Sequence, residues 1–211
     1  MRITPLAFLL AAPAVGTAAS PSLAQPQPVA PYAATQTADA RLKALYEAYA
    51  DWDQKEGGYF VDSKGENQSA AYLPKVDPAT QLARARFEKQ MLDQLNAIPI
   101  ASLSPDDRVN AGVLRAILEA AVTDAKFRDW EMPANSDSNF WTYLNERDSL
   151  DDAAAYQRYI ARMRDIPRYF GEEIANMRAG LKRGFTPPQA TLAGRDASIA
   201  SFIKPAEQNA F

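Results

Sequence analysis

The sequence predicts an all-α fold, an irregular bundle of about five to seven helices with one long kinked helix from Asp151 to Gly184. Three observations support this prediction. Apolar residues recur at steps of three and four along several segments, which places them on one face of a helix. These segments begin with capping residues followed by proline or acidic residues. No alternating run of β-branched residues is long enough to indicate a strand.

Residues 1–24 have the pattern of a secretory signal peptide. Arg2 gives a short positive start, residues 3–15 are mainly apolar, and Ser22-Leu23-Ala24 is a small-x-small cleavage site. The following residues 25–36, rich in proline, alanine and glutamine, are expected to be a flexible linker. Residues 37–211 remain as one helical domain. Export predicts a periplasmic or secreted protein.

Composition limits the possible partners. The net charge is -3, and removal of Arg2 with the leader makes it -4. A mildly acidic chain without a basic stripe is not expected to bind nucleic acid. No basic amphipathic helix is present for a membrane surface, so we expect no membrane association after signal cleavage. There is no cysteine, which excludes disulfides and a lipid-anchored cysteine.

The first helix is expected to start at Thr37, whose hydroxyl can cap it, and to end before Gly57. Residues 57–76 are loop-like, with Gly65, Asn67 and Pro74 as punctuation. The inward face of the helix is predicted to be Leu42, Leu45, Tyr46, Tyr49 and Trp52.

Two further helices are expected to start at Asp77-Pro78 and at Ser104-Pro105, each a cap followed by proline at the first helical position. The second helix is predicted to end near Pro99. Its apolar stripe is Leu82, Ala85, Leu92 and Leu95. The stripe of the third is Val109, Val113, Leu114, Ile117, Leu118, Ala121, Val122 and Ala125.

The long helix is expected to start at Asp151 and Asp152 and to end at the left-handed cap Gly184. Pro167 removes a backbone donor inside the pattern, so we expect a kink or break and two helical pieces. Thr186 is placed to cap a further helix, and residues 188–204 are expected to form the last one. The stripe of the long helix is Tyr156, Tyr159, Ile160, Met163, Ile166, Phe170, Ile174, Met177 and Leu181.

The chain contains no histidine and no cysteine. This removes the commonest zinc ligands, the usual general base near neutral pH and the cysteine nucleophile. Ser201 and Lys204 match the Ser-x-x-Lys pattern of penicillin-recognising enzymes. The later Ser-x-Asn and Lys-Thr-Gly motifs of such enzymes are missing, so we interpret both residues as ordinary exposed side chains. We assign no catalytic residue and no metal ligand to this chain.

Adjacent carboxylates are interpreted as structural. Asp106-Asp107 and Asp151-Asp152 are first-turn acids that complement the helix dipole. Glu172-Glu173 lies in the middle of a helix, where neighbours in sequence point in different directions, and is expected on a solvated face.

The segment from Asn135 to Tyr143 is the candidate substrate-facing region. Its polar residues favour a turn or helix cap, with an incomplete calcium loop as the alternative, because the glycine and terminal glutamate of such loops are missing. The aromatic residues beside them either line a pocket or belong to the core. The residues proposed to face substrate are Asn135, Ser136, Asp137, Trp141 and Tyr143.

The order of these features resembles the N-terminal part of a bacterial family known as domain of unknown function 885, whose members look like zinc metallopeptidases of the gluzincin type. The resemblance covers essentially all of residues 37–211, as the N-terminal part of a longer family domain. It rests on residues 40–49, Leu73-Pro74-Lys75-Val76-Asp77-Pro78, Leu103-Ser104-Pro105-Asp106-Asp107-Arg108, Val113-Leu114-Arg115, Trp130-Glu131-Met132-Pro133, Ser136-Asp137, Phe140-Trp141 and residues 156–188.

The resemblance implies the N-terminal helical portion of an exported zinc-dependent peptidase-like hydrolase, a scaffold and cleft wall that is not catalytic by itself. The family's His-Glu-x-x-x-Gly-His-His-type motif lies beyond the equivalent of Phe211, so zinc is expected in the full-length parent and no cofactor in this chain. The implied partners are a C-terminal catalytic region of the same chain and a peptide substrate. The alternative is a free-standing periplasmic helical binding protein. Packing against a missing catalytic half also predicts that the isolated chain self-associates.

Overall fold

The computed structural model describes residues 36–134, 140–143, 150–201 and 203–208. Helices α1 (Ala38–Glu56), α2 (Pro78–Asn96) and α3 (Pro105–Phe127) start at the caps that the sequence predicts. The side chains of Thr37, Asp77 and Ser104 accept hydrogen bonds from backbone N–H groups of the first turn. Proline occupies the first helical position of α2 and α3, where its missing N–H has no intrahelical partner to lose.

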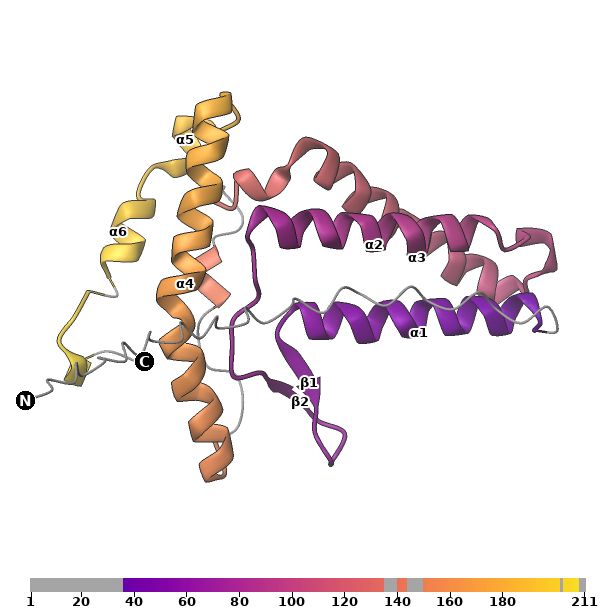
Figure 1. Ribbon diagram of the computed structural model, residues 1–211, viewed down its shortest axis with the longest axis horizontal. Coiled ribbons are helices and arrows are strands. Elements are labelled where there is room, and N and C mark those ends of the chain that lie inside the picture. The colour runs from indigo at the N-terminus through magenta and orange to yellow at the C-terminus, as the bar shows by residue number, and fades with distance from the viewer. Residues whose placement is uncertain (1–35, 135–139, 144–149, 202, 209–211) are drawn as a thin grey trace, which may run out of the picture.

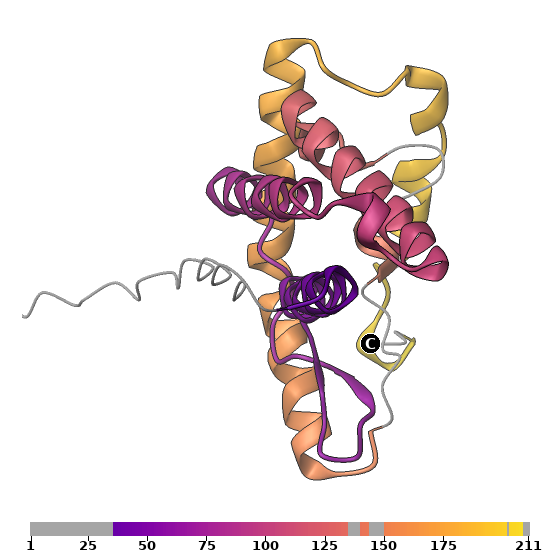
Figure 2. The same cartoon turned by 90° about the vertical axis from the view of Figure 1, so that its right-hand side faces the viewer.

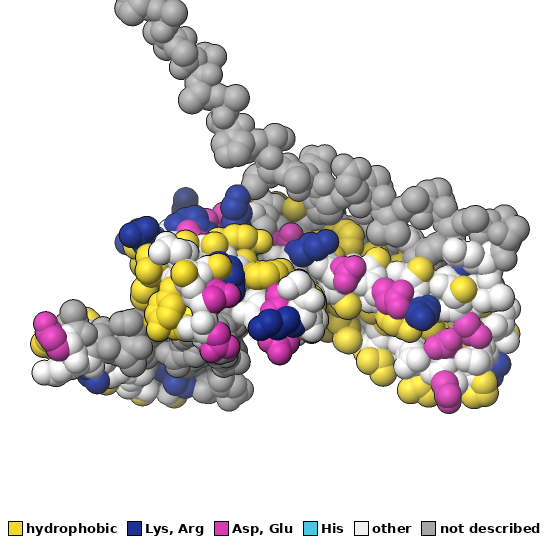
Figure 3. Space-filling view, turned by 90° about the horizontal axis from the view of Figure 1, so that it is seen from below, with side chains coloured by type: hydrophobic (Ala, Val, Ile, Leu, Met, Phe, Trp, Pro, Cys, Tyr) yellow, Lys and Arg dark blue, Asp and Glu magenta, His cyan; other side chains and the backbone are white. Residues whose placement is uncertain are grey.

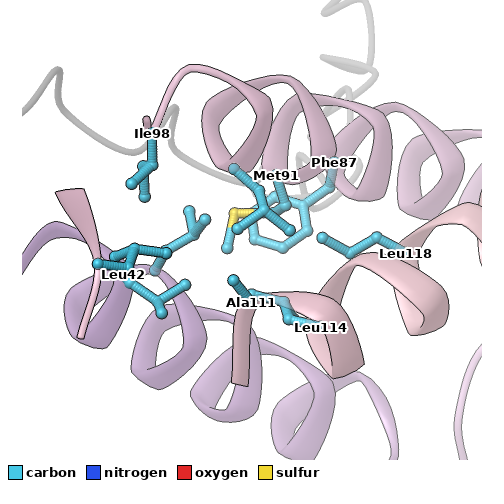
Figure 4. Packing of buried hydrophobic residues seen from close by; sticks show 10 residues of the cluster. Leu42, Phe87, Met91, Ile98, Ala111, Leu114 and Leu118 are labelled. Carbon is cyan, nitrogen blue, oxygen red and sulfur yellow. The ribbon is translucent and has the colours of Figure 1, made fainter. Parts of the chain in front are cut away.

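The main core lies between α1, α2 and α3 (Figure 4). Leu42 and Leu45 of α1, with Met91 of α2 and Leu118 of α3, are completely buried. Trp52 extends this core by stacking on Phe87, with ring centroids 4.4 Å apart. The other members are Leu95, Ile98, Leu103, Ala111 and Leu114.

Two of the predicted apolar stripes differ from the buried faces. On α2, Leu82 is 45% exposed, and the face in the core is formed by Phe87, Met91 and Leu95. On α3, Val109, Val113 and Ile117 are exposed, and Ala111, Leu114 and Leu118 point inward. The predicted stripe of α2 is therefore wrong, because it contains Leu95 but not Phe87 or Met91. The predicted stripe of α3 does contain the buried Leu114 and Leu118, but the partner helices cover a narrower arc than its apolar residues occupy.

Residues 57–76 include a hairpin that the sequence analysis interprets as loop. Strands β1 (Tyr59–Val61) and β2 (Asn67–Ser69) pair antiparallel. The turn between them is held by Asp62, whose carboxylate accepts from the N–H groups of Lys64 and Glu66. Gly65 takes a φ of 82° in this turn, a conformation that glycine adopts without strain. Strands of three residues are too short to show an alternating pattern.

Helix α4 (Ala153–Arg183) is the predicted long helix, capped by Asp152 and ended by Gly184 with a φ of 75°. Pro167 lies inside it, and the helix continues through the proline, so the interpretation as two pieces is wrong. Asp165 and Arg168, on either side of the proline, both bond to the backbone of residues 73–74. These bonds hold this part of α4 against the backbone of residues 73–74.

The C-terminal turn of α4 packs on the short helix η2 (Asp129–Glu131). Another short helix, η1 (Ile100–Ser102), precedes α3. The buried carboxylate of Glu131 accepts from Arg183 at 2.7 Å and lies 3.3 Å from Arg128. Gly180 faces Glu131 so closely that an added Cβ would lie 2.6 Å from its carbonyl oxygen. This contact fixes how far α4 approaches η2.

The remaining helices are short. They are η3 (Phe140–Tyr143), α5 (Gln189–Leu192), α6 (Arg195–Ala200) and η4 (Ala206–Gln208). Residues 188–204 therefore do not form one helix, because Gly194 takes a φ of 77° and interrupts it. The expectation that Thr186 caps the next helix is also wrong, since α5 begins after Pro188 without a side-chain cap.

The molecule has two parts that cross each other (Figure 1). One part is α1, α2 and α3 with the hairpin, and the other is α4. Helices α1 and α2 run crosswise to α4, and α5 and α6 lie on the opposite side of α4 (Figure 1). Seen from the side, α1, α2 and α3 form one group in front of α4, with the hairpin below α1 (Figure 2). The expected all-α irregular bundle is confirmed. Within the described residues, no helix has the length and apolar character needed to cross a bilayer.

Candidate ligand-binding site

One face of α4 binds the extended backbone of residues 73–76. The N–H of Leu73 donates to Asp165 Oδ2, and the N–H of Val76 donates to Glu172 Oε2, both at 2.8 Å. Arg168 Nη2 donates to the carbonyl of Leu73, and Asn176 Nδ2 donates to the carbonyl of Val76, both at 2.7 Å. We call Asp165, Arg168, Glu172 and Asn176 the α4 clamp. Their spacing of three and four residues puts them on one side of the helix.

The clamp corrects the interpretation of Glu172-Glu173 as a solvated face. Glu172 accepts from Val76 and lies 2.8 Å from Arg168 Nη1. Glu173 is 5% exposed, and burial raises the pKa of its carboxyl to about 7, against the opposing effect of hydrogen bonds from Tyr169 and Asn176. The buried residues Leu73, Val76, Phe140, Trp141 and Tyr169 form a second core beside these polar groups.

A cavity of about 640 Å³ opens where this clamped segment meets α1 and α2. Its walls come from α1, the loop before α2, α2 itself and α4. They are formed by Trp52, Lys55, Glu56, Tyr72, Leu73, Lys75, Ala79, Thr80, Ala83, Arg84, Arg86, Asp165 and Arg168. A volume of this size is typical of pockets for small organic ligands. We call it the basic pocket.

The basic pocket carries an excess of positive charge. Lys55, Lys75, Arg84, Arg86 and Arg168 line it, against the carboxylates of Glu56 and Asp165. Both carboxylates are already paired. Glu56 lies 2.8 Å from Arg84 Nε, and Asp165 lies 2.6 Å from Arg168 Nη2.

These ion pairs fix two guanidinium groups in the pocket wall. The side chains of Arg84 and Arg168 are 18% and 31% exposed. The hydrogen bond from Arg168 and the backbone N–H of Leu73 hold the pKa of Asp165 below its usual value, against the effect of its partial burial. The carboxylate of Asp165 therefore stays ionised and cannot act as a proton donor near neutral pH.

Three cations remain at the exposed rim. Lys55, Lys75 and Arg86 are exposed. Among the residues that the structure describes, none of the three has an ion pair within 4.0 Å. The rim can therefore bind an anion without breaking an existing pair.

The N-terminus of α2 reaches the same pocket through Ala79 and Thr80. The N–H groups of both residues already donate to Asp77 Oδ1, at 3.0 and 3.1 Å. Partial burial acts to raise the pKa of Asp77, but the hydrogen bonds from the Thr80 hydroxyl and from the N–H groups of Thr80 and Ala79 hold it below its usual value. An anion in the pocket would consequently be bound by side-chain cations and not by these backbone donors.

A second, smaller cavity of about 310 Å³ lies on the other side of Arg84. Glu88, Asp124 and Asp129 line it together with Trp130. Burial raises the pKa of Glu88 to about 7, against the nearby charge of Arg84 and with the help of Asp53 and Asp124. No three acidic residues in the described ranges are close enough together to hold a metal ion.

Of the residues predicted to face substrate, the structure describes Trp141 and the backbone of Tyr143, and neither belongs to the lining of the basic pocket. Asn135, Ser136 and Asp137 fall outside the described residues. Trp141 is 6% exposed and packs edge-on against Phe140, with ring centroids 5.0 Å apart. Tyr143 ends η3, and its substrate-facing role stays a prediction.

The residues of the basic pocket were not identified from sequence. Lys55 and Lys75 are isolated lysines in a helix end and a loop, and Arg86 lies on an ordinary polar helix face. No motif joins them, because the fold brings together residues up to 116 positions apart, from Trp52 to Arg168. Ser201, of the Ser-x-x-Lys pattern, is exposed, and its hydroxyl donates to the carbonyl of Ser198 at 2.6 Å.

Comparison with known proteins gives one match. The family described as "Bacterial protein of unknown function (DUF885)" matches residues 59–211. No curated protein and no solved structure matches the chain. The matched range contains the α4 clamp and most of the basic pocket, whereas Trp52, Lys55 and Glu56 precede it.

Proposed function

Because the chain belongs to the DUF885 family, we propose that it is the N-terminal helical portion of an exported, metallopeptidase-like hydrolase. In this proposal the chain binds peptide substrate and forms one wall of the cleft. Catalysis is carried out by a separate C-terminal region of the same protein. The first 24 residues direct the protein to the periplasm or the exterior, in keeping with their signal-peptide pattern.

The side-chain chemistry supports a binding role for this chain. Without histidine or cysteine it lacks the commonest general base near neutral pH and the thiol nucleophile. The two carboxylates of the basic pocket, Glu56 and Asp165, are both paired with arginine, so neither is free to accept a proton from water. Recognition of a charged ligand is the chemistry that these residues can perform.

Zinc does not fit the residues of this chain. Its preferred ligands are histidine and cysteine, which the sequence lacks, with carboxylates completing the set. In residues 36–134 and the other described ranges, the acidic side chains do not form a group of three that could hold a metal. A metal of the parent enzyme would therefore be bound by residues outside this chain.

The single observation that carries the proposal is the basic pocket. Its walls come from α1, α2, α4 and the loop between the hairpin and α2, which form a junction of the two crossing parts of the molecule. Ligand pockets commonly form between the packed helices of a bundle. A peptide bound there would lie across the face where α4 meets α1 and α2.

A second candidate function is a free-standing periplasmic binding protein. It is favoured by the pocket itself, which already has both cations and an apolar side and so can hold a small ligand. The two candidates differ in the gene sequence beyond the codon for Phe211. Sequencing the source DNA past that codon distinguishes them: a reading frame that continues to a His-Glu-x-x-x-Gly-His-His-type motif supports the hydrolase, and an immediate stop supports the binding protein.

The role of this chain within the hydrolase is tested by activity. The chain is incubated with zinc and a mixture of fluorogenic peptides, beside the product of the longer reading frame. We expect hydrolysis by the longer product and none by the chain alone. Zinc-dependent cleavage by the chain itself would contradict the non-catalytic role.

Export is tested separately. N-terminal sequencing of protein recovered from the periplasm is expected to start at Gln25.

A further inference from the structure

We propose that the basic pocket binds a peptide carboxylate, through Lys55, Lys75 and Arg86 at its rim. This inference rests on the proposed function in that it names the chemical group of the substrate that this chain recognises. It also applies to a free-standing binding protein, because every residue involved belongs to the pocket of this chain.

The charge of the pocket selects an anion. Two of its five cations, Arg84 and Arg168, already neutralise Glu56 and Asp165. Lys55, Lys75 and Arg86 are left with three positive charges and no carboxylate within 4.0 Å among the described residues. Since like charges around one cavity repel, an anionic ligand stabilises the arrangement.

The pocket wall explains why the anion is a carboxylate attached to an organic group. Trp52, Tyr72 and Leu73 give the cavity an apolar side, next to the cations. A free inorganic anion is hydrated on all sides and gains nothing from that wall. A peptide places its carboxylate among the cations and an apolar side chain against the rings.

The α2 N-terminus also disfavours inorganic phosphate. Phosphate sites commonly use the free N–H groups of a helix N-terminus. Here Asp77 accepts from Ala79 and Thr80, and its negative charge lies beside the same pocket. A single carboxylate can be bound by the lysine ammonium groups and the guanidinium of Arg86, and it needs fewer hydrogen-bond donors than inorganic phosphate does.

The experiment measures binding of defined ligands to the whole chain by isothermal titration calorimetry at low ionic strength. The ligands are an N-acetylated tetrapeptide with an aromatic last residue and a free C-terminal carboxylate, the same peptide as its C-terminal amide, and inorganic phosphate. We expect the free acid to bind, and both the amide and phosphate to bind at least about 10-fold more weakly.

Two triple variants isolate the pocket charge. The pocket variant carries Lys55→Gln, Lys75→Gln and Arg86→Gln. The control carries Lys126→Gln, Arg178→Gln and Lys204→Gln, three exposed cations outside the pocket that lower the net charge equally. We expect the pocket variant to bind the acid about 10- to 100-fold more weakly, and the control to retain the affinity within about threefold.

A further variant keeps the charges and fills the space. Ala79 is exposed at the pocket, so Ala79→Phe is expected to block the peptide while urea unfolding of the chain stays unchanged. Unfolding curves for all variants separate loss of binding from loss of fold.

Each result decides the inference. Equal affinity for acid and amide, equal weakening by both triple variants, or preference for phosphate would overturn it. None of these results bears on whether the chain cleaves peptides or on the reading frame beyond Phe211, which are the tests of the proposed function. The selective loss of acid binding in the pocket variant supports the inference.

Discussion

Glu173 is a buried carboxyl group without an arginine or lysine partner in the described structure. It is 5% exposed, beside Asn176, which is 1% exposed. Burial disfavours its ionised form, and the neighbouring charge of Glu172 adds to this effect. The side chain therefore couples the stability of the α4 contact to pH.

The stability of the chain is predicted to fall as the pH rises from about 4.5 to about 7. In this window the unfolded chain releases the proton of Glu173, whereas the folded chain retains it because the folded pKa is raised from 4.5 to about 7. The loss is of the order of 2 kcal/mol in the free energy of unfolding. Urea unfolding at pH 4.5 and pH 8 measures it, and Glu173→Gln should reduce the difference. Glu88, whose pKa is also raised to about 7, accounts for a further part, which Glu88→Gln removes. An unchanged pH dependence in Glu173→Gln would show that this carboxyl is not the group involved.

Asn176 is predicted to be important for stability because its amide donates to the carbonyl of Val76 at 2.7 Å. Asn176→Ala leaves that carbonyl without this donor in a buried place, and we expect a loss of about 1–3 kcal/mol in the free energy of unfolding. Asn110→Ala is the control, since Asn110 is exposed and bonds only to Asp107 on its own helix. Equal effects of the two variants in urea unfolding would argue against the α4 clamp.

At the residue scale, local chemistry was predictable and long-range chemistry was not. Thr37, Asp77, Ser104 and Asp152 cap helices as expected, because a cap is decided by residues two or three positions away. Glu172 was expected to be solvated, but its partner Val76 lies 96 residues earlier in the chain. No local pattern carries that information.

The position of α4 depends on a glycine. An added Cβ at Gly180 would lie 2.6 Å from the carbonyl oxygen of Glu131 and 2.7 Å from that of Phe185. Both atoms belong to the backbone, so neither can rotate away. The close approach of α4 to η2 is possible only where the side chain is missing.

Two alanine substitutions in the same helix are predicted to have opposite effects. Gly180→Ala should lower the free energy of unfolding by about 1–3 kcal/mol through the backbone clash. Gly171→Ala should raise it by about 0.5–1 kcal/mol, since nothing lies within 4 Å of the added Cβ and alanine favours the helix. Thermal and urea unfolding of the pair measure both. A stabilising effect at Gly180 would show that α4 can move away from η2.

At the scale of helices and strands, the length of an element decided whether the sequence could predict it. The helices of 19 residues or more were expected from their period and caps. The hairpin was missed because each strand has three residues, which cannot show a period of two. The break at Pro167 was predicted from local sterics, but the helix continues through it, and on both sides of the proline α4 bonds to residues 73–74.

The surface of the whole molecule retains apolar side chains. Val109, Val113 and Ile117 form a stripe on α3 with exposures of 66%, 55% and 45%. Figure 3 shows that hydrophobic side chains also reach the surface seen from below, among the charged ones. Stripes at helical spacing of this kind bind other apolar surfaces.

We predict that the chain self-associates through this stripe as its concentration rises. The triple variant Val109→Gln, Val113→Gln and Ile117→Gln should remain monomeric at concentrations where the original chain does not. Leu181→Gln, a single apolar residue with 69% exposure on α4, is the control and should not change association. Sedimentation velocity measures all three chains. A monodisperse original chain would contradict the prediction.

The candidate site itself exists only at the scale of the whole molecule. Its cations come from α1, α2, α4 and the loop at Lys75, and each is an ordinary polar residue in its own segment. The all-α class follows from local patterns, but the crossing of α4 over the other helices does not. The basic pocket forms where α4 crosses the other helices, so it could not be predicted from the sequence.

The α4 clamp also has a consequence for the order of folding. Its bonds join residues 92 to 100 positions apart, whereas α2 and α3 are neighbours in sequence. Closing such a long loop carries a large entropy loss before any contact compensates for it, so local contacts form first. We therefore expect α1, α2 and α3 to assemble early and α4 to dock late. The backbone N–H groups of Leu73 and Val76 donate hydrogen bonds to side chains of α4. Their protons should therefore be among the last to become protected from exchange with solvent during refolding.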